Sequence, residues 1–145
     1  MSARKYIQAS FAKSYAERAQ VYRSRVSAWK KMSTVERAEK PTNPGRAHSI
    51  GYRAKKEFVI VRVRVAKGRR RLGKRALGRK PAKKIKFRPL NFPLSRMAEM
   101  KAEKEFNNLK AIGSYFVGED GMSKYFEVVL HNEHQGSAPN RPKAK

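Results

Sequence analysis

A dense cationic run extends from Arg62 to Arg88. It holds 14 basic residues in 27 positions, contains no acid, and is interrupted only by short glycine, proline and apolar positions. Like charges at this density repel one another and no apolar period persists, so the run cannot pack against itself. We therefore predict a long basic extended arm over residues 67–93, which is disordered alone and becomes ordered on RNA.

The rest of the composition limits the class of protein. The chain has 145 residues, 36 Lys and Arg, 11 Asp and Glu, and no Cys, which gives a net charge of +25. The length fits one ordinary domain and excludes a multidomain enzyme. The absence of Cys excludes disulfides and Cys-type zinc sites. No apolar run reaches the roughly 18 residues of a membrane span. We expect a soluble intracellular protein, no membrane association, and a polyanion as partner.

The first 40 residues have a helical pattern. Apolar side chains recur at Ile7, Phe11 and Tyr15, and again from Tyr22 through Val26 to Trp29. Ser14 and Glu17 have the spacing of a capping box, so we expect the helix to restart there. Ser33 and Glu36 repeat that spacing and predict a short helix that ends at Pro41. The opposite face carries Arg18, Arg25 and Lys31, either as a solvated face or as phosphate contacts.

Residues 41–66 predict a basic loop followed by a strand. Two prolines within Pro41–Gly45 indicate a turn. The loop after it interleaves basic side chains with His48 and Tyr52, a pattern suited to following a phosphate backbone and stacking a base. Taken alone, His48 is better explained as an ordinary surface histidine than as a metal ligand, since no second His or carboxylate stands at metal spacing around it.

The strand is the clearest element in the sequence and spans Glu57–Ala66. Four valines alternate onto one face, which we expect to be buried. The other face ends in Arg62 and Arg64, which a rigid strand either directs at phosphates or leaves solvated.

The last third carries nearly balanced charge. We predict a helix from about Arg96 to Lys110, ended by Gly113, and then a hairpin of Ser114–Val117 and Lys124–Leu130. In the second strand, one face carries Phe126, Val128 and Leu130, and the other carries Tyr125, Glu127 and Val129. Glu119 and Asp120, in the turn, are the only adjacent acids. Turn chemistry explains them better than catalysis or Mg²⁺ binding, and they are also able to pair with basic groups elsewhere.

Together these elements predict an α+β fold: a small, mainly antiparallel sheet with packed helices, plus the arm and a basic tail. We expect one domain over residues 1–135 and the tail over 136–145. Within the domain, residues 1–40 are helical, 41–66 form the basic loop and strand, 67–93 the arm, and 94–132 the helix and hairpin.

Two stretches carry a family resemblance. The pattern Pro41-x-x-Pro44-x-Arg46, then Gly51-Tyr52-Arg53-Ala54-Lys55 and the strand from Phe58 to Val65, resembles the large-subunit ribosomal protein family fifteen-e of archaea and eukaryotes. The stretch from Ser114 to Asp120, followed by Lys124-Tyr125-Phe126-Glu127-Val128, is similar to the same family's C-terminal hairpin. The opening Lys5-Tyr6-Ile7-Gln8 and Trp29 also fit. The family usually continues into a longer basic tail, whereas this sequence stops at Lys145.

The resemblance implies a non-catalytic structural constituent of the cytoplasmic ribosome that binds large-subunit rRNA, supports subunit assembly and translation, and touches neighbouring large-subunit proteins. It implies no small-molecule substrate and no cofactor beyond rRNA-associated Mg²⁺. Matched RNA-facing positions are Arg46, Tyr52, Arg53, Lys55, Arg62 and Arg64. The full candidate set for RNA binding is Arg4, Lys5, Arg18, Arg25, Lys31, Arg46, His48, Tyr52, Arg53, Lys55, Lys56, Arg62, Arg64, Lys67, Arg69, Arg70, Arg71, Lys74, Arg75, Arg79, Lys80, Lys83, Lys84, Lys86 and Arg88.

Two alternatives differ in function. Charge and size alone also fit a histone-like, DNA-compacting protein, although the balanced last third argues against it. An RNA-processing enzyme would have to draw its acid–base groups from His48, His131, His134, Glu119, Asp120 and Glu133, and no nucleophile, metal or nucleotide motif joins them.

Overall fold

The computed structural model describes residues 3–68, 70–71, 87–88 and 90–132. Its elements follow one another along the chain as α1 (Ala3–Ala16), α2 (Gln20–Lys31), β1 (Val35–Ala38), α3 (Pro44–Ile50), β2 (Phe58–Ala66), β3 (Arg70–Arg71), β4 (Phe87–Arg88), α4 (Leu94–Glu105), β5 (Lys110–Glu119) and β6 (Ser123–His131).

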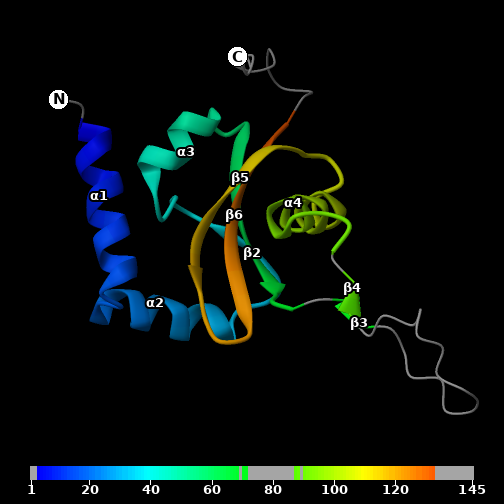
Figure 1. The fold of residues 1–145 in the computed structure, drawn as a ribbon. Coiled ribbons are helices and arrows are strands. Elements are labelled where there is room, and N and C mark those ends of the chain that lie inside the picture. Colours follow the sequence, from blue (N-terminus) through cyan, green and yellow to red (C-terminus); the bar gives the residue numbers. More distant parts are fainter. Residues whose placement is uncertain (1–2, 69, 72–86, 89, 133–145) are drawn as a thin grey trace, which may run out of the picture.

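An antiparallel sheet forms the centre of the fold. Its four strands lie in the order β1-β2-β6-β5, with each neighbouring pair antiparallel. Helices α1, α2 and α3 lie on one side of this sheet and α4 on the other (Figure 1). The predicted α+β class with an antiparallel sheet and packed helices is therefore confirmed.

The alternation of β2 decides which side chains meet α4. Val61, Val63 and Val65 are fully or almost fully buried against Ala98 and Ala102 of α4. Small alanines on the helix let its backbone approach the branched valines closely, which suits the dense packing of protein interiors. The predicted buried valine face is confirmed.

The opposite face of the sheet packs against the N-terminal helices. Tyr22, Val26 and Trp29 of α2 are buried against Tyr125 and Val129 of β6, as their helical spacing predicts. Helix α1 is attached more loosely. It has no buried residue, and Phe11 and Tyr15 are only partly covered. One side of α1 therefore remains open.

The break between α1 and α2 lies later than predicted. Ser14 is an ordinary residue of α1, which continues to Ala16, and α2 begins at Gln20 after Ala19, which makes no side-chain cap. The turn instead depends on Arg18, whose backbone has a positive φ of 51°. This left-handed conformation is unfavourable for a residue with a side chain, so surrounding contacts have to hold it.

The short helix predicted after Ser33 is wrong. Residues Val35–Ala38 form β1, which pairs with β2 from Val35 opposite Val63 to Ala38 opposite Ile60. A capping-box spacing is a local signal, whereas pairing with β2 gives this segment interstrand backbone hydrogen bonds and places Val35 against the core. The tertiary context therefore overrides the local preference.

The loop predicted for residues 41–56 contains a helix. Asn43 caps α3 by accepting a hydrogen bond of 3.1 Å from the Arg46 N–H, and Pro44 occupies the first turn. Asn before Pro is a favourable helix start, since the cap satisfies a free N–H and proline needs none. Gly51 ends α3 with a φ of 115°.

The C-terminal helix ends earlier than predicted. Helix α4 stops at Glu105, and β5 already begins at Lys110 and includes Gly113. A side chain at Gly113 would lie 3.0 Å from Ile50 Cγ2, so glycine is needed there for the close approach of α3 rather than to end a helix. The two predicted hairpin strands lie within β5 and β6, and the predicted faces of β6 are confirmed.

The arm begins beside the hairpin turn. The Lys67 N–H donates to the Met122 carbonyl oxygen at 2.8 Å, Gly68 has a φ of 117°, and β3 then pairs with β4, Arg70 opposite Arg88. The remainder of the arm and the tail lie outside the described residues, so their extended form stays a prediction.

Candidate nucleic-acid interface

An acid-free cationic surface is formed by α1 and α3 together with the loop after α3. No Asp or Glu occurs in residues 1–16 or 40–56. The two segments are in contact, because a side chain built at Gly45 of α3 would lie 3.2 Å from Arg4 Cγ of α1. Seven of the predicted side chains are exposed here, namely Arg4, Lys5, Arg46, His48, Arg53, Lys55 and Lys56. The fold thus joins cations that are some 40 positions apart.

The His48 ring is exposed and held in place. Its Nδ1 lies 2.9 Å from the Tyr52 carbonyl oxygen, across the end of α3. The Tyr52 ring is half-buried, packed edge-on to Phe58 at 6.3 Å and joined to the core. Tyr52 therefore packs mainly against the core. Little of its ring is left exposed for the predicted stacking of a base.

The second predicted group lies on α2. Arg25 and Lys31 are exposed, whereas Trp29, Tyr22 and Val26 turn inward. The helix therefore presents the cationic side that the sequence predicts, and it covers the sheet with its aromatic side. Residues Gln20–Lys31 contain no acid that would neutralise this side.

Arg62, expected on the cationic face of β2 as a phosphate contact or as a solvated side chain, is instead largely buried. Only 14% of its side chain is exposed, and its guanidinium bonds Glu127 at 2.9 Å and stacks over the Trp29 ring at 4.7 Å. Arg64 is half-buried and donates to the Lys30 carbonyl oxygen at 2.9 Å. Helix α2 covers this face of β2 with its aromatic side, where the sequence pattern alone predicts solvent or RNA.

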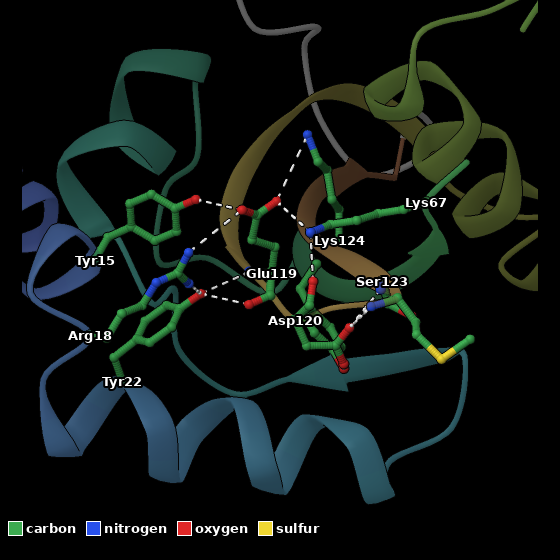
Figure 2. Close-up of polar contacts among 10 residues, drawn as sticks. Tyr15, Arg18, Tyr22, Lys67, Glu119, Asp120, Ser123 and Lys124 are labelled. Atoms are coloured by element: carbon green, nitrogen blue, oxygen red, sulfur yellow. Dashed lines mark hydrogen bonds and ion pairs between the residues drawn. The ribbon is translucent and has the colours of Figure 1, made fainter. Parts of the chain in front are cut away.

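The Glu119 side chain gathers cations from three segments, as Figure 2 shows. Its carboxylate lies 2.9 Å from Lys67 Nζ, 3.6 Å from Arg18 Nη2 and 3.9 Å from Lys124 Nζ, and accepts a hydrogen bond from the Tyr15 hydroxyl. The hydrogen bond from Lys67, and then that from Tyr15, hold the pKa of Glu119 below its ordinary value despite partial burial. Burial and the same contact raise the pKa of Tyr15.

Asp120 shapes the turn itself. Its Oδ1 accepts from the Met122 and Ser123 N–H groups at 2.7 and 2.6 Å, and its Oδ2 lies 3.7 Å from Lys30 Nζ. Partial burial would raise the pKa of Asp120, but the backbone donors outweigh it and lower that pKa. Both interpretations of the acid pair, turn chemistry and pairing with distant cations, are thus confirmed.

Sequence reasoning missed Lys30 and Lys124 as members of this cluster. Lys30 belongs to α2 and Lys124 to β6, and each reaches the hairpin turn only through the fold. No spacing pattern along the chain connects them. The one available signal was the acid pair itself, which is the natural destination for nearby cations.

Much of the candidate set lies outside what the structure describes. This applies to Arg69, Lys74, Arg75, Arg79, Lys80, Lys83, Lys84 and Lys86, and to the side chains of Arg70, Arg71 and Arg88.

The fold separates those candidate acid–base groups that it describes, whereas Glu133 and His134 lie outside the described residues. The register of the β5–β6 hairpin sets Glu119 opposite Lys124 at one end and Lys110 opposite His131 at the other. His131 is buried against Phe58, with ring centroids 4.8 Å apart, and His48 lies on α3. Among the residues described, no three His, Asp or Glu side chains are placed to hold a metal ion. None of the described helices combines the length and apolarity needed to cross a bilayer.

Comparison with known proteins identifies a family that matches this chain. Residues 2–145 match the protein family described as Ribosomal L15, of the L15e type. The large ribosomal subunit protein eL15 of Nanoarchaeum equitans is 37% identical over 123 residues, covering 85% of this chain and 65% of that protein.

Two further archaeal relatives carry the same name. The eL15 proteins of Methanospirillum hungatei and Methanocella arvoryzae are each 35% identical, over 80% and 81% of this chain and 60% and 61% of their own length. This chain therefore spans less than two thirds of the length of these three relatives. The match over almost every residue, together with these identities, shows that the chain belongs to the L15e family of large-subunit ribosomal proteins.

Proposed function

We propose that this chain is a structural, non-catalytic component of the large ribosomal subunit in the cytoplasm that binds and stabilises large-subunit rRNA. Through this binding it supports subunit assembly and translation. Its partners are the rRNA and neighbouring large-subunit proteins. It uses no cofactor of its own, and Mg²⁺ enters only as an ion of the rRNA.

The observation that carries this proposal is the acid-free cationic surface. Residues 1–16 and 40–56 supply cations from α1, α3 and the following loop, and no carboxylate in these segments competes for them. Each phosphate neutralised by such a side chain releases condensed counterions, which is the main sequence-independent source of affinity for nucleic acid.

The layered core gives this surface a fixed shape. Helix α3 is anchored by buried Ala47 and by its Asn43 cap, so Arg46 and His48 project from a rigid element. An A-form RNA helix is recognised largely through its shape, phosphates and 2′-hydroxyls. A rigid array of cations is therefore sufficient, and contacts to base edges are not required.

The proposed contact set is narrower than the sequence predicts. Arg62 is not included, because its guanidinium is paired with Glu127. Tyr52 is not included as a stacking residue, because its ring packs against Phe58. The exposed cations of α1, α2, α3 and residues 53–56 remain. The basic residues of the arm also remain, as a proposal that rests on their charge alone.

A binding experiment with the full chain tests the proposal. We expect transcribed large-subunit rRNA to bind more tightly than duplex DNA of equal length, with log K falling steeply against log salt. Arg46→Ala and Arg53→Ala should each weaken binding to rRNA and reduce that slope by about 1. The exposed Lys104 of α4 provides the control, since Lys104→Ala removes the same charge from another side of the fold.

Equal affinity for duplex DNA and rRNA would contradict the proposal and favour a DNA-compacting protein. A flat salt dependence would contradict phosphate neutralisation as the source of affinity.

A further inference from the structure

Four cations from four different parts of the fold surround the turn between β5 and β6. They are Arg18 from the α1–α2 junction, Lys30 of α2, Lys67 directly after β2, and Lys124 of β6. Glu119 and Asp120 are the two acids among them, so the cluster carries a net charge of +2. We call these six residues the hairpin-tip cluster.

The carboxylates lie deeper than the cations. The side chain of Glu119 is 21% exposed and that of Asp120 is 10% exposed, whereas Arg18, Lys30 and Lys124 are 46%, 57% and 38% exposed. In a simple surface ion pair both charges face water equally. Here the negative groups are largely covered, and the cations supply most of the cluster's exposed charged surface.

The cations have donors to spare. A lysine ammonium has three N–H donors and a guanidinium has five. The ion pairs of Lys30 with Asp120 and of Lys124 with Glu119 measure 3.7 and 3.9 Å, which is longer than a strong charge-assisted hydrogen bond. The Lys124 ammonium also lies over the Phe116 ring, 6.0 Å from its centroid, a contact that uses no N–H donor on an oxygen. Arg18 spends one donor on the Tyr22 hydroxyl at 2.9 Å. Donors therefore remain for an anion that approaches from solvent.

The two acids of the cluster are held in place before any ligand arrives. The Tyr22 hydroxyl both accepts from the Glu119 N–H and donates to the Glu119 carbonyl oxygen, each at 2.9 Å. Asp120 is fixed by its two backbone donors. Their carboxylates attract the cations toward one place, and a cationic side chain that is already drawn there loses less rotamer freedom when it binds an anion.

We propose that the hairpin-tip cluster binds a phosphodiester group of RNA, with Arg18, Lys30 and Lys124 as ligands and Glu119 and Asp120 as positioning residues. This inference rests on the proposed function and deepens it, because it adds Lys30 and Lys124 to the contact set and assigns a role to the acid pair. Lys67 belongs to the supporting layer, since its ammonium bonds both Glu119 and the Asp120 carbonyl oxygen.

Two lysine substitutions test the ligands directly. In titrations of the full chain with transcribed large-subunit rRNA, Lys30→Ala and Lys124→Ala should each reduce the slope of log K against log salt by about 1. Both side chains are substantially exposed, so folding should survive, which circular dichroism checks. Lys104→Ala on α4 is the matched control.

A substitution at Glu119 tests positioning by the sign of its effect. Glu119→Gln removes a negative charge, so charge counting alone predicts tighter binding to a polyanion. Positioning predicts the reverse: severalfold weaker binding, because Arg18 and Lys124 lose their support. Glu105→Gln, at an exposed position of α4, removes the same charge away from the cluster and should leave binding to rRNA equal or slightly tighter.

The outcomes separate the two proposals. If wild-type chain does not prefer rRNA, the proposed function itself fails. If it does, but Lys30→Ala and Lys124→Ala keep the wild-type slope, or Glu119→Gln binds as tightly as Glu105→Gln, only the hairpin-tip site is overturned.

Discussion

Arg62 and Glu127 face each other across β2 and β6 and form a buried ion pair, with Nη2 2.9 Å from Oε1. Glu127 is fully buried, and its carboxylate also accepts from the Thr42 N–H at 2.9 Å and from the Tyr115 hydroxyl at 2.6 Å. Burial, and then the charge of Glu127, raise the pKa of Tyr115 strongly, so its hydroxyl stays protonated as a donor. The pair therefore fastens the segment before α3 to the centre of the sheet.

Removing Arg62 should be among the most damaging single changes to the described core. Arg62→Ala leaves the Glu127 charge buried without its partner, and loss of one member of such a pair costs about 3–5 kcal/mol of unfolding free energy. Urea denaturation measures the loss. Arg37→Ala, at the exposed position of β1, should lower the unfolding free energy by less than about 1 kcal/mol. A similarly small effect at Arg62 would mean that the ion pair contributes little to stability.

Glu119 should make stability depend on pH in the acid range. Its folded pKa lies below the ordinary value of 4.5, so its stabilising contribution is complete above that value and is lost as the pH falls through the lowered folded pKa. Wild type should therefore be more stable than Glu119→Gln at neutral pH, and the difference should shrink below about pH 4.5. A constant difference between the two proteins from pH 7 to pH 3 would rule out this linkage.

Gly118 should tolerate no side chain. A Cβ there would lie 3.0 Å from Trp29 and 3.1 Å from Tyr22, whose rings are packed into the core. Gly118→Ala should lower the unfolding free energy by about 1–3 kcal/mol through overpacking. Gly121 in the adjoining turn has no described atom near enough to obstruct a Cβ, so Gly121→Ala is the control and should have little effect.

Asn43 should set the start of α3. Asn43→Ala removes the acceptor for the Arg46 N–H and should cost about 1 kcal/mol in thermal or urea unfolding. Asn43→Asp keeps the acceptor and should retain most of that stability, so equal losses in both variants would show that the cap is not the cause.

The elements predicted correctly from the sequence are those whose own apolar residues recur with a clear strand or helix period. Alternation assigns the valines of β2 to one face, and Phe126, Val128 and Leu130 of β6 to one face of their strand. Both sets lie together in the core beside α4, as predicted, although the other face of β6 is buried as well. Such alternation works because strand side chains point to opposite faces in turn. The buried side of α2 was predicted equally well, since its three core residues follow helical spacing.

The errors arise where distant partners outweigh local signals. Segment 35–38 has a helix-start spacing before it, yet pairing with β2 makes it a strand. Helix α3 was hidden by two prolines, although Asn43-Pro44 is itself a start signal. Arg62 read as a surface cation because its partner Glu127 stands 65 positions away. The exposed cations were predictable as a set, but their arrangement in the fold was not.

The short ladder at the root of the arm has a consequence for how far the length of the arm can vary. Pairing of Arg70 with Arg88 and of Arg71 with Phe87 brings the two ends of the intervening segment together (Figure 1). The distance between β2 and α4 therefore does not fix how many residues lie between positions 71 and 87. A change in that number leaves the pairing of β2 with β6 and the packing of α4 on the sheet unaltered.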